Sequence, residues 1–221
     1  MSPRPSAGSR TTPVAVTAEG MEHLAKADPV MAAIVKAHGR LDEEGRRRGR
    51  PADAYGALLR SVVGQQLSTK AARTIYGRLT GLYGDRTPTP EELMETDPER
   101  LREVGLSRAK ASYLRSLAEH VLAGKLELER LDELPDEEVS AQLTDVKGLG
   151  QWTADMFLIF HLSRPDVLPV GDLGIRRAVQ IAYGLDGLPT AAELTRTAEP
   201  WRPHRSLASL YLWSALDNAP G

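Results

Sequence analysis

The sequence predicts an all-α protein, and three observations support this fold class. Helix N-terminal signals recur along the chain, each a Ser, Thr or Asp that precedes a Pro or an apolar run with helical spacing. Gly and Pro turns separate these runs, whereas the alternating apolar–polar patterns of half-buried strands are nearly missing. With 221 residues, of which 41% are hydrophobic, the chain is long enough to bury a core in one domain or in two closely packed lobes.

Side-chain caps mark the predicted helix starts, in chain order at Asp28-Pro29, Asp53, Ser68, Thr89-Pro90-Glu91-Glu92, Asp97-Pro98, Ser107 and Thr190. In each, an oxygen can accept from the unpaired N–H groups of a first helical turn, and Pro at the first helical position needs no donor. Several of these helices are predicted to end at a glycine. The predicted ends are Gly39, Gly64, Gly81 or Gly84, and Gly105, each for a different helix. The Trp201–Pro203 region opens the last predicted helix.

The clearest helix starts at Ser107, because its apolar residues recur at about 3.6-residue spacing. They are Ala111, Leu114, Leu117, Ala118, Val121 and Leu122. In total we expect roughly ten short helices joined by tight turns.

Charge is distributed unevenly, although 28 basic and 30 acidic residues leave a net charge of only −2. The segment from Glu127 to Glu138 contains seven acids and one base, a net −6, so the rest of the chain carries +4. Basic residues cluster at Arg46, Arg47, Arg48 and Arg50, and again at Arg176 and Arg177. The acidic run is expected on the outside of the bundle. A basic surface for nucleic acid is allowed by these numbers, and so is an ordinary solvated face.

The absence of cysteine from the sequence excludes a disulfide framework, a zinc ribbon, an iron–sulfur cluster and a thiol nucleophile. Residues 1–18 are rich in Pro, Ser, Thr and Gly and contain no apolar core, which predicts a disordered tail rather than a signal peptide. The strongly apolar stretch from Met156 to Leu162 is too short to span a bilayer. We therefore expect a protein of the cytoplasm or nucleoid with no membrane partner.

The segment LTDVKGLGQWTA, residues 143–154, predicts a turn between two helices. Its glycines permit a sharp turn and a close approach of a ligand to the backbone, and the first N–H groups of the second helix favour an anion. This is a helix-hairpin-helix pattern, which grips DNA phosphates without reading sequence. A simple Schellman-type turn between helices would look similar. The candidate phosphate-binding residues are Lys147, Gly148, Leu149, Gly150 and Thr153.

Asp172 lies where a loop enters a predicted helix, nineteen residues after Thr153. An Asp at that position is an excellent N-cap, and capping requires no chemistry. Downstream of a phosphate-binding hairpin, however, a fixed carboxylate suits cleavage of an N-glycosidic bond. It stabilises an oxocarbenium-like sugar and can orient or deprotonate the attacking water. Arg176 and Arg177 are placed one turn further on to meet phosphates or to pair with acids.

With these residues the sequence resembles the helix-hairpin-helix (HhH-GPD) DNA glycosylase superfamily, and within it the alkylpurine branch, the 3-methyladenine DNA glycosylase II (AlkA) type. Four stretches in the family's order carry the resemblance, SVVGQQLSTKAA (61–72), DVKGLGQWTADMF (145–157), LPVGDLGIRRA (168–178) and WRPHRSLASLYLW (201–213). The resemblance implies one glycosylase domain over residues 19–221, a short form without the N-terminal α/β domain of larger relatives. Two helical lobes would flank an active-site cleft, with the termini in one lobe and about residues 60–165 in the other.

The resemblance implies that Asp172 is the catalytic aspartate. Trp152 stands where members that also cut the backbone have a nucleophilic lysine, which favours a monofunctional enzyme that leaves an abasic site. The implied base pocket consists of Trp152, Met156 and Trp213, with Phe157 and Tyr211 as weaker candidates. An electron-rich indole attracts a positively charged alkylpurine, although core packing explains both tryptophans equally well. Met156 replaces a pocket tyrosine of the larger relative, which leaves the range of lesions open.

The loop Gln65-Gln66-Leu67 matches the element that enters the duplex when a base is flipped out. The register places Gln66 at the tip, next to Leu67, and a polar turn between helices is the alternative. The resemblance also implies that the hairpin carbonyls of Thr144, Val146 and Leu149 hold a monovalent cation, Na⁺ or K⁺. No other cofactor is required. The expected partner is double-stranded DNA with alkylated bases, bound by a monomer.

Three other functions remain open from the sequence. A non-catalytic helix-hairpin-helix DNA-binding module would explain the glycines but not Asp172 together with the WRPHRS block. A bifunctional glycosylase/lyase is disfavoured by Trp152. A mismatch or uracil-type glycosylase on the same fold is disfavoured by the missing cluster cysteines, whereas the range of lesions stays open.

Overall fold

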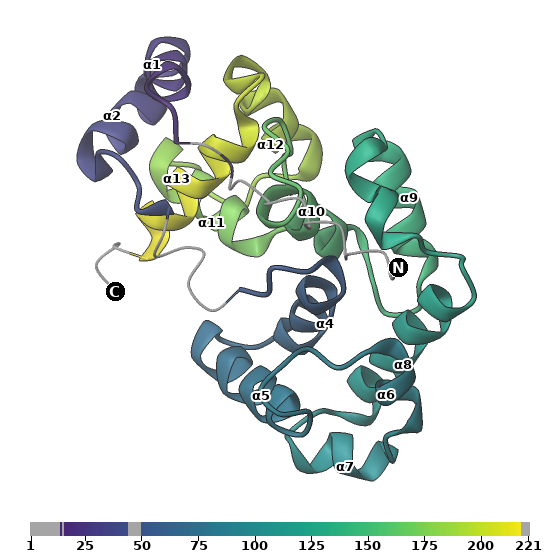
Figure 1. Ribbon diagram of the computed structural model, residues 1–221. Coiled ribbons are helices and arrows are strands. Elements are labelled where there is room, and N and C mark those ends of the chain that lie inside the picture. Colours follow the sequence, from purple (N-terminus) through teal and green to yellow (C-terminus); the bar gives the residue numbers. More distant parts are fainter. Residues whose placement is uncertain (1–13, 15, 44–49, 218–221) are drawn as a thin grey trace. The chain divides into compact units, whose positions relative to one another are not determined.

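The computed structural model describes residues 14, 16–43 and 50–217 (Figure 1). All regular elements in these ranges are helices, which confirms the predicted all-α class. The α-helices are α1 Ala18–Ala27, α2 Pro29–His38, α4 Ala54–Gly64, α5 Thr69–Gly81, α6 Pro90–Glu95, α7 Pro98–Glu103, α8 Arg108–Leu122, α9 Asp136–Asp145, α10 Gln151–Phe160, α11 Leu173–Tyr183, α12 Ala191–Thr197 and α13 Arg205–Asp217. Two 3₁₀ helices, η1 Leu128–Glu133 and η2 Glu199–Trp201, complete the set.

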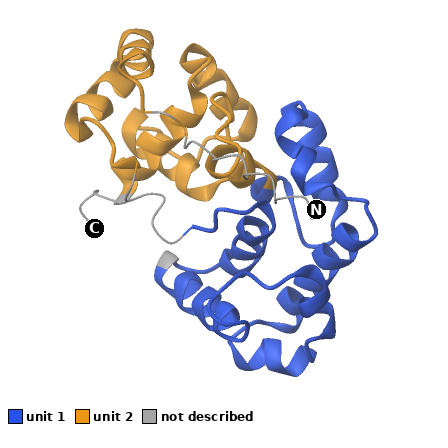
Figure 2. Ribbon diagram, viewed as in Figure 1, with its two compact units in different colours: residues 1–12, 49–153 blue, residues 13–48, 154–221 orange. Residues whose placement is uncertain are grey.

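The chain forms two compact units (Figure 2). Residues 49–153 form unit 1, which contains α4 to α9 and the first turn of α10. Residues 13–48 and 154–221 form unit 2, which contains α1, α2, the rest of α10 and α11 to α13. Unit 2 is thus built from two segments that are distant in the sequence.

The predicted caps are present in the structure, and each capping side chain accepts from a backbone N–H of its helix's first turn. Thr89 and Thr190 form complete capping boxes with Glu92 and Glu193. At the C-terminal end, the Trp201–Pro203 region forms the end of η2 and a turn, and α13 begins later, at Arg205.

The structured part of the chain begins before residue 19, contrary to the expected tail boundary. Val14 and Val16 are buried, and the Thr17 hydroxyl accepts from Gly20 N–H to cap α1. Apolar side chains at these two positions are enough to draw the segment onto a core. The remainder of the expected tail, residues 1–13 and 15, lies outside the described residues, as do Arg46, Arg47 and Arg48 of the basic cluster.

In unit 1, α8 is the helix around which the others assemble, because α4, α6 and α7 all pack against it. Its apolar face is buried at Ala111, Leu114, Leu117 and Ala118, as its spacing predicts, whereas Val121 is half-buried and Leu122 in the last turn is 47% exposed. The acidic run follows α8 and forms η1 and the start of α9. Leu131 anchors this run in the core, while six of its seven acids are exposed, as expected, and Asp136 is half-buried.

In unit 2, α13 (yellow in Figure 1) packs against α1, α2 and α11. Polar contacts join the loop that precedes α11 to the first turn of α13. Arg205 makes a paired contact with the Asp166 carboxylate, with its Nε 2.7 Å from Oδ1 and its Nη2 3.0 Å from Oδ2. The buried Ser206 hydroxyl accepts from Val167 N–H at 2.9 Å. The WRPHRS block therefore holds unit 2 together through Arg205 and Ser206.

A single buried carboxylate, Asp28, joins three elements of unit 2. It caps α2 by accepting from Val30 N–H and Met31 N–H, and it also accepts from the Tyr183 hydroxyl at the end of α11 and from Trp201 Nε1 at 3.0 Å. Burial by itself raises the pKa of Asp28, but these hydrogen bonds outweigh that effect and hold the pKa below its ordinary value. Burial and the bond to Asp28 raise the pKa of Tyr183.

Among the described residues, no helix combines the length and apolar character needed to cross a bilayer.

We expect Asp28→Ala to lower the free energy of unfolding by about 3 kcal/mol, because it removes a cap and leaves the buried Trp201 N–H and the half-buried Tyr183 hydroxyl without their acceptor. Asp97→Ala, which removes an exposed cap with one hydrogen bond, is the control and should cost about 1 kcal/mol. The two changes are compared by denaturant unfolding.

Because the folded-state pKa of Asp28 is lowered, its stabilisation is fully present above its ordinary pKa and is lost as the pH falls through the folded-state value. The difference in stability between the wild-type protein and Asp28→Ala should therefore be constant above about pH 5 and shrink as the pH falls below about 4. A difference that stays constant would show that the carboxylate charge does not contribute.

Candidate functional site

The predicted hairpin forms in unit 1 between the end of α9 and the start of α10. Leu149 N–H donates to the Val146 carbonyl at 3.0 Å, and Thr153 N–H donates to the Gly150 carbonyl at 2.9 Å, which closes the turn and begins α10. Val146 and Leu149 are 1% and 3% exposed, so they pin the turn to the core. Lys147, between these two residues, and Gly150, directly after Leu149, are exposed. The turn therefore presents its backbone to solvent while its apolar side chains point inward.

The two hairpin glycines are required for different physical reasons. Gly148 adopts φ +93°, and a Cβ built on it would lie 2.1 Å from Cγ of Tyr113 on α8, so the ring leaves no room for any side chain. At Gly150 a Cβ would meet nothing within 4 Å, and its backbone is not left-handed. Gly148 is thus required by the fold, whereas only an external ligand would require glycine at position 150.

The 65–67 loop follows α4 directly, and its three residues lie in different settings. Gln65 is half-buried, and its Nε2 donates to the Gly148 carbonyl at 2.9 Å and to Thr153 Oγ1 at 3.4 Å. Gln66 is exposed with φ +57°, a left-handed conformation that is uncommon outside glycine. Leu67 is exposed to 38%. Gln65 therefore faces the hairpin, and Gln66 and Leu67 are the residues of this loop that face solvent.

In unit 2, Asp172 occupies the N-cap position of α11, as its sequence context predicts. Its Oδ1 accepts from Ile175 N–H at 2.8 Å and from Trp213 Nε1 at 3.0 Å. Asp172 is half-buried, and the two bonds hold its carboxylate at the exposed end of the helix. Capping and a chemical role are compatible, since capping orients the same group that chemistry would use.

Trp213 is held on α13 by three neighbours. Its indole N–H is bonded to Asp172, its ring stacks on Phe160 with centroids 5.6 Å apart, and a Cβ on Gly174 would lie 3.3 Å from the indole edge. The side chain is therefore fixed in position and remains half-buried. Trp152 and Met156, one turn apart on α10, are also half-buried.

Phe157 and Tyr211 differ from the other candidates for the base pocket because they lie in the core. Phe157 is 3% exposed and stacks on His161. Tyr211 is fully buried, and its hydroxyl donates to the Gly39 carbonyl at 2.8 Å. Their aromatic character is explained by packing inside unit 2.

The basic pair after Asp172 is engaged with neutral groups rather than acids. Arg176 Nε donates to the Pro189 carbonyl at 2.8 Å, and Arg177 donates to the Gln180 side chain at 2.6 Å. Arg177 is exposed. The expectation that this pair contacts phosphates stays a prediction.

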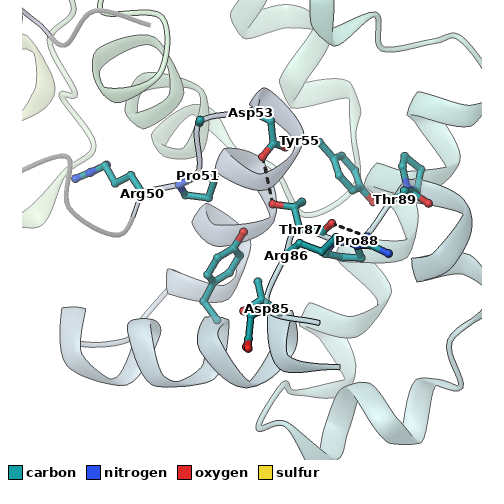
Figure 3. A pocket seen from close by; sticks show the side chains of 13 residues that line it. Arg50, Pro51, Asp53, Tyr55, Asp85, Arg86, Thr87, Pro88 and Thr89 are labelled. Atoms are coloured by element: carbon teal, nitrogen blue, oxygen red, sulfur yellow. Dashed lines mark hydrogen bonds between the residues drawn. The ribbon is translucent and has the colours of Figure 1, made fainter. Parts of the chain in front are cut away.

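An open pocket of about 730 Å³ lies elsewhere in unit 1, between the start of α4 and the 85–90 loop (Figure 3). Asp53 and Thr87 both line it, and the Thr87 hydroxyl donates to the Asp53 carboxylate at 3.2 Å. The buried Tyr55 hydroxyl, also in the lining, has no hydrogen-bond partner among the described residues. Burial raises the pKa of Tyr55. None of the site residues predicted from the sequence lines this pocket. The candidate site is therefore not the pocket in Figure 3.

Four residues near the candidate site were not found by sequence reasoning, namely Lys110, Tyr113, Phe160 and Gly174. Lys110 Nζ donates to the carbonyls of Val63 and Gln65, at the C-terminal end of α4. Such contacts join residues that are far apart in the chain. The residues next to a lysine in a helix do not indicate which distant carbonyls it will contact. Among the described residues, no group of His, Cys, Asp or Glu is placed to hold a metal ion.

Comparison with known proteins identifies relatives for most of the chain. Residues 59–203 match the family model described as "HhH-GPD superfamily base excision DNA repair protein". The chain is 38% identical over 163 residues, 73% of its length, to DNA-3-methyladenine glycosylase 1 of Schizosaccharomyces pombe, of which it covers 72%.

Two solved structures are similar to most of the chain. One is the Schizosaccharomyces pombe 3-methyladenine DNA glycosylase in complex with abasic DNA, with a TM-score of 0.83 at 35% identity over 89% of this chain and 95% of that one. The other is a DNA-3-methyladenine glycosidase from Bacillus halodurans, with a TM-score of 0.76 at 34% identity over 92% of this chain and 91% of that one. The chain belongs to the HhH-GPD superfamily of base excision DNA repair proteins.

Proposed function

We propose that the protein is a monofunctional DNA glycosylase that hydrolyses the N-glycosidic bond of alkylated purines in duplex DNA. The observation that carries the proposal is the carboxylate of Asp172, which is oriented by Ile175 N–H and Trp213 Nε1 in a chain that also contains the family's hairpin. The relatives named above as 3-methyladenine DNA glycosylases support the choice of substrate class.

In the proposed reaction, the bond between C1′ and the base nitrogen breaks and the base leaves with the bonding electrons. The sugar then resembles an oxocarbenium ion, and the Asp172 carboxylate stabilises its positive charge. Water adds at C1′ and gives up a proton, for which Asp172 is the acceptor. Trp213 and Ile175 restrict the carboxylate to one orientation, so less reorganisation is needed when the charge develops.

Trp152 supports the monofunctional assignment. An amine nucleophile at this position would form a covalent intermediate with C1′ and lead to strand cleavage, and an indole cannot do so. Trp152, Met156 and Trp213 are the half-buried candidates for base contact. Positively charged bases such as 3-methyladenine and 7-methylguanine favour the indole faces, and the adaptable Met156 sets which of them fit.

The hairpin is the proposed contact with the DNA backbone. Because Gly150 is exposed and has no side chain, a phosphate can approach the backbone at the start of α10, and the exposed Lys147 adds a positive charge nearby. Gln66 and Leu67 are the proposed residues that fill the space of the flipped nucleotide.

The carbonyls of Thr144, Val146 and Leu149 are the proposed ligands of a monovalent cation. The Val146 carbonyl accepts Leu149 N–H and retains a second lone pair, so the turn's geometry is compatible with that role. When bound, Na⁺ or K⁺ would add positive charge where a phosphate approaches. Because the proposed substrate is chromosomal DNA, we place the protein in the cytoplasm or nucleoid, acting as a monomer.

The test of the proposed function is base release from methylated duplex DNA, with 3-methyladenine, 7-methylguanine and 1-methyladenine separated as products. The wild-type protein should release alkylpurines, and borohydride should trap no covalent adduct. Asp172→Asn should bind lesion DNA normally and release base roughly 10³-fold more slowly, because the carboxylate charge is lost while the cap is kept. DNA binding without any base release by the wild-type protein would instead indicate a non-catalytic module.

Replacing each hairpin glycine by alanine should separate DNA contact from folding. Gly150→Ala should leave the unfolding midpoint unchanged and weaken binding to all duplexes alike, about tenfold, because its Cβ meets only what approaches from outside. Gly148→Ala should destabilise the fold by about 3 kcal/mol or more, because it collides with Tyr113 at a left-handed position. Unchanged DNA affinity of Gly150→Ala would contradict the backbone contact.

Trp201 and Trp213, which both donate to an aspartate, should differ in what they control. Trp213→Phe keeps an aromatic ring against Phe160 and loses the donor to Asp172, so base release should slow by about tenfold or more with little change in stability. Trp201→Phe strands the buried Asp28 and should lower the free energy of unfolding by about 2 kcal/mol, with the rate of the folded protein retained. Single-turnover rates and denaturant unfolding distinguish these outcomes.

A further inference from the structure

The 65–67 loop and the hairpin turn share one support within unit 1, the N-terminal half of α8. Lys110 Nζ donates to the Val63 carbonyl at 2.8 Å and to the Gln65 carbonyl at 2.6 Å. Tyr113, three residues further along the same helix, places its ring directly against Gly148 of the hairpin. Residues three apart lie on the same face of a helix. One face of α8 therefore contacts both elements.

The two elements are also joined directly through the Gln65 side chain. Its amide nitrogen carries two N–H groups and lies 2.9 Å from the Gly148 carbonyl and 3.4 Å from the Thr153 hydroxyl. The Gln65 backbone carbonyl, in turn, is an acceptor of the Lys110 ammonium. Gln65 is thus held at its backbone by α8 and at its side chain by the hairpin.

The charge of Lys110 serves this contact rather than an ion pair within the described chain. Its ammonium donates to two backbone carbonyls at the C-terminal end of α4, where the helix dipole favours a cation. Burial lowers the pKa of Lys110, which reflects the partial loss of water around the ammonium.

The exposed tip of the loop depends on these contacts. Gln66 has φ +57°, a conformation that persists only where the surrounding structure imposes it. Gln65 immediately precedes it and is fixed on both sides, while Leu67 N–H donates to the Gly64 carbonyl at 3.1 Å. Loss of the anchors at Gln65 would allow the loop to leave the left-handed conformation and would change the direction of Gln66 and Leu67.

We propose that Gln65 and Lys110 are positioning residues that fix the 65–67 loop to the hairpin turn, so that both meet duplex DNA as one rigid surface. The proposal rests on the proposed function in one respect, because it assumes that Gln66 and Leu67 enter the duplex when a base is flipped out. Backbone binding by the hairpin then orients the loop without a further loss of conformational freedom. Gln65 contributes to base flipping through the loop it anchors rather than by entering the duplex.

The test uses the full chain with Gln65→Met or Lys110→Met, which keep side-chain length and remove the donor. Gln142→Met on α9 and Lys125→Met, an exposed lysine after the end of α8, are the matched controls. Affinity for undamaged duplex is measured by fluorescence anisotropy. Entry of the loop is measured by the fluorescence of 2-aminopurine in the duplex at saturating protein, which reports unstacking of bound DNA and requires no base release.

Both test variants should bind undamaged duplex within about threefold of the wild-type affinity, because the hairpin backbone remains. The equilibrium constant for unstacking should fall about tenfold, the effect of losing one well-placed hydrogen bond. The controls should change neither quantity. If Lys110→Met does not fold, Gln65→Met decides the outcome, since it removes no charge.

Three results would overturn the proposal. They are unchanged unstacking in Gln65→Met, a loss of unstacking that merely parallels a loss of affinity and of stability, and a wild-type protein that binds duplex without any unstacking. Failure of the proposed function is a separate result, because it would appear as absent base release from methylated DNA with unstacking retained.

Discussion

The buried Asp28 carboxylate is the interaction on which the rest of unit 2 depends. It joins the start of α2, the end of α11 and the indole of Trp201, so segments from both ends of the chain meet at one charged group. Hydrogen bonds from four donors compensate for its burial, and the loss of any donor or of the carboxylate leaves a desolvated polar group. Through Tyr183, this contact fixes the C-terminal end of α11, the helix whose N-terminal end carries Asp172.

The same chemical arrangement occurs at both ends of α11 with different consequences. Asp172, like Asp28, caps a helix and accepts an indole N–H from the C-terminal part of the chain. The difference is burial, since Asp28 is 7% exposed and Asp172 is half-buried at a helix end. The hydrogen bonds of the buried Asp28 stabilise unit 2, whereas those of the half-buried Asp172 orient a carboxylate at the start of a helix. α11 thus connects a structural aspartate with the proposed catalytic one.

Unit 1 relies on close contact rather than buried charge. The ring of Tyr113 occupies the space that a side chain at position 148 would need, and Val146 and Leu149 anchor the turn on either side. A turn held this firmly presents Gly150 and the first turn of α10 in one conformation. Gln65 and Lys110 extend the same rigidity to the neighbouring 65–67 loop. A preorganised backbone surface suits a ligand such as DNA, whose phosphates have fixed spacing.

The sequence by itself determined the all-α class, the capped helix starts and the position of the hairpin, because caps, glycine turns and helical periodicity act between residues a few positions apart. It also located Asp172 at a helix start. Only the tertiary structure decided that Phe157 and Tyr211 are core residues, that Gln65 faces the hairpin instead of solvent, and that Trp213 bonds to Asp172. Each of these features depends on side chains that are separated by tens of residues in the sequence. An aromatic or amide side chain is buried or exposed according to the surface that packs against it, and a local sequence pattern does not contain that information.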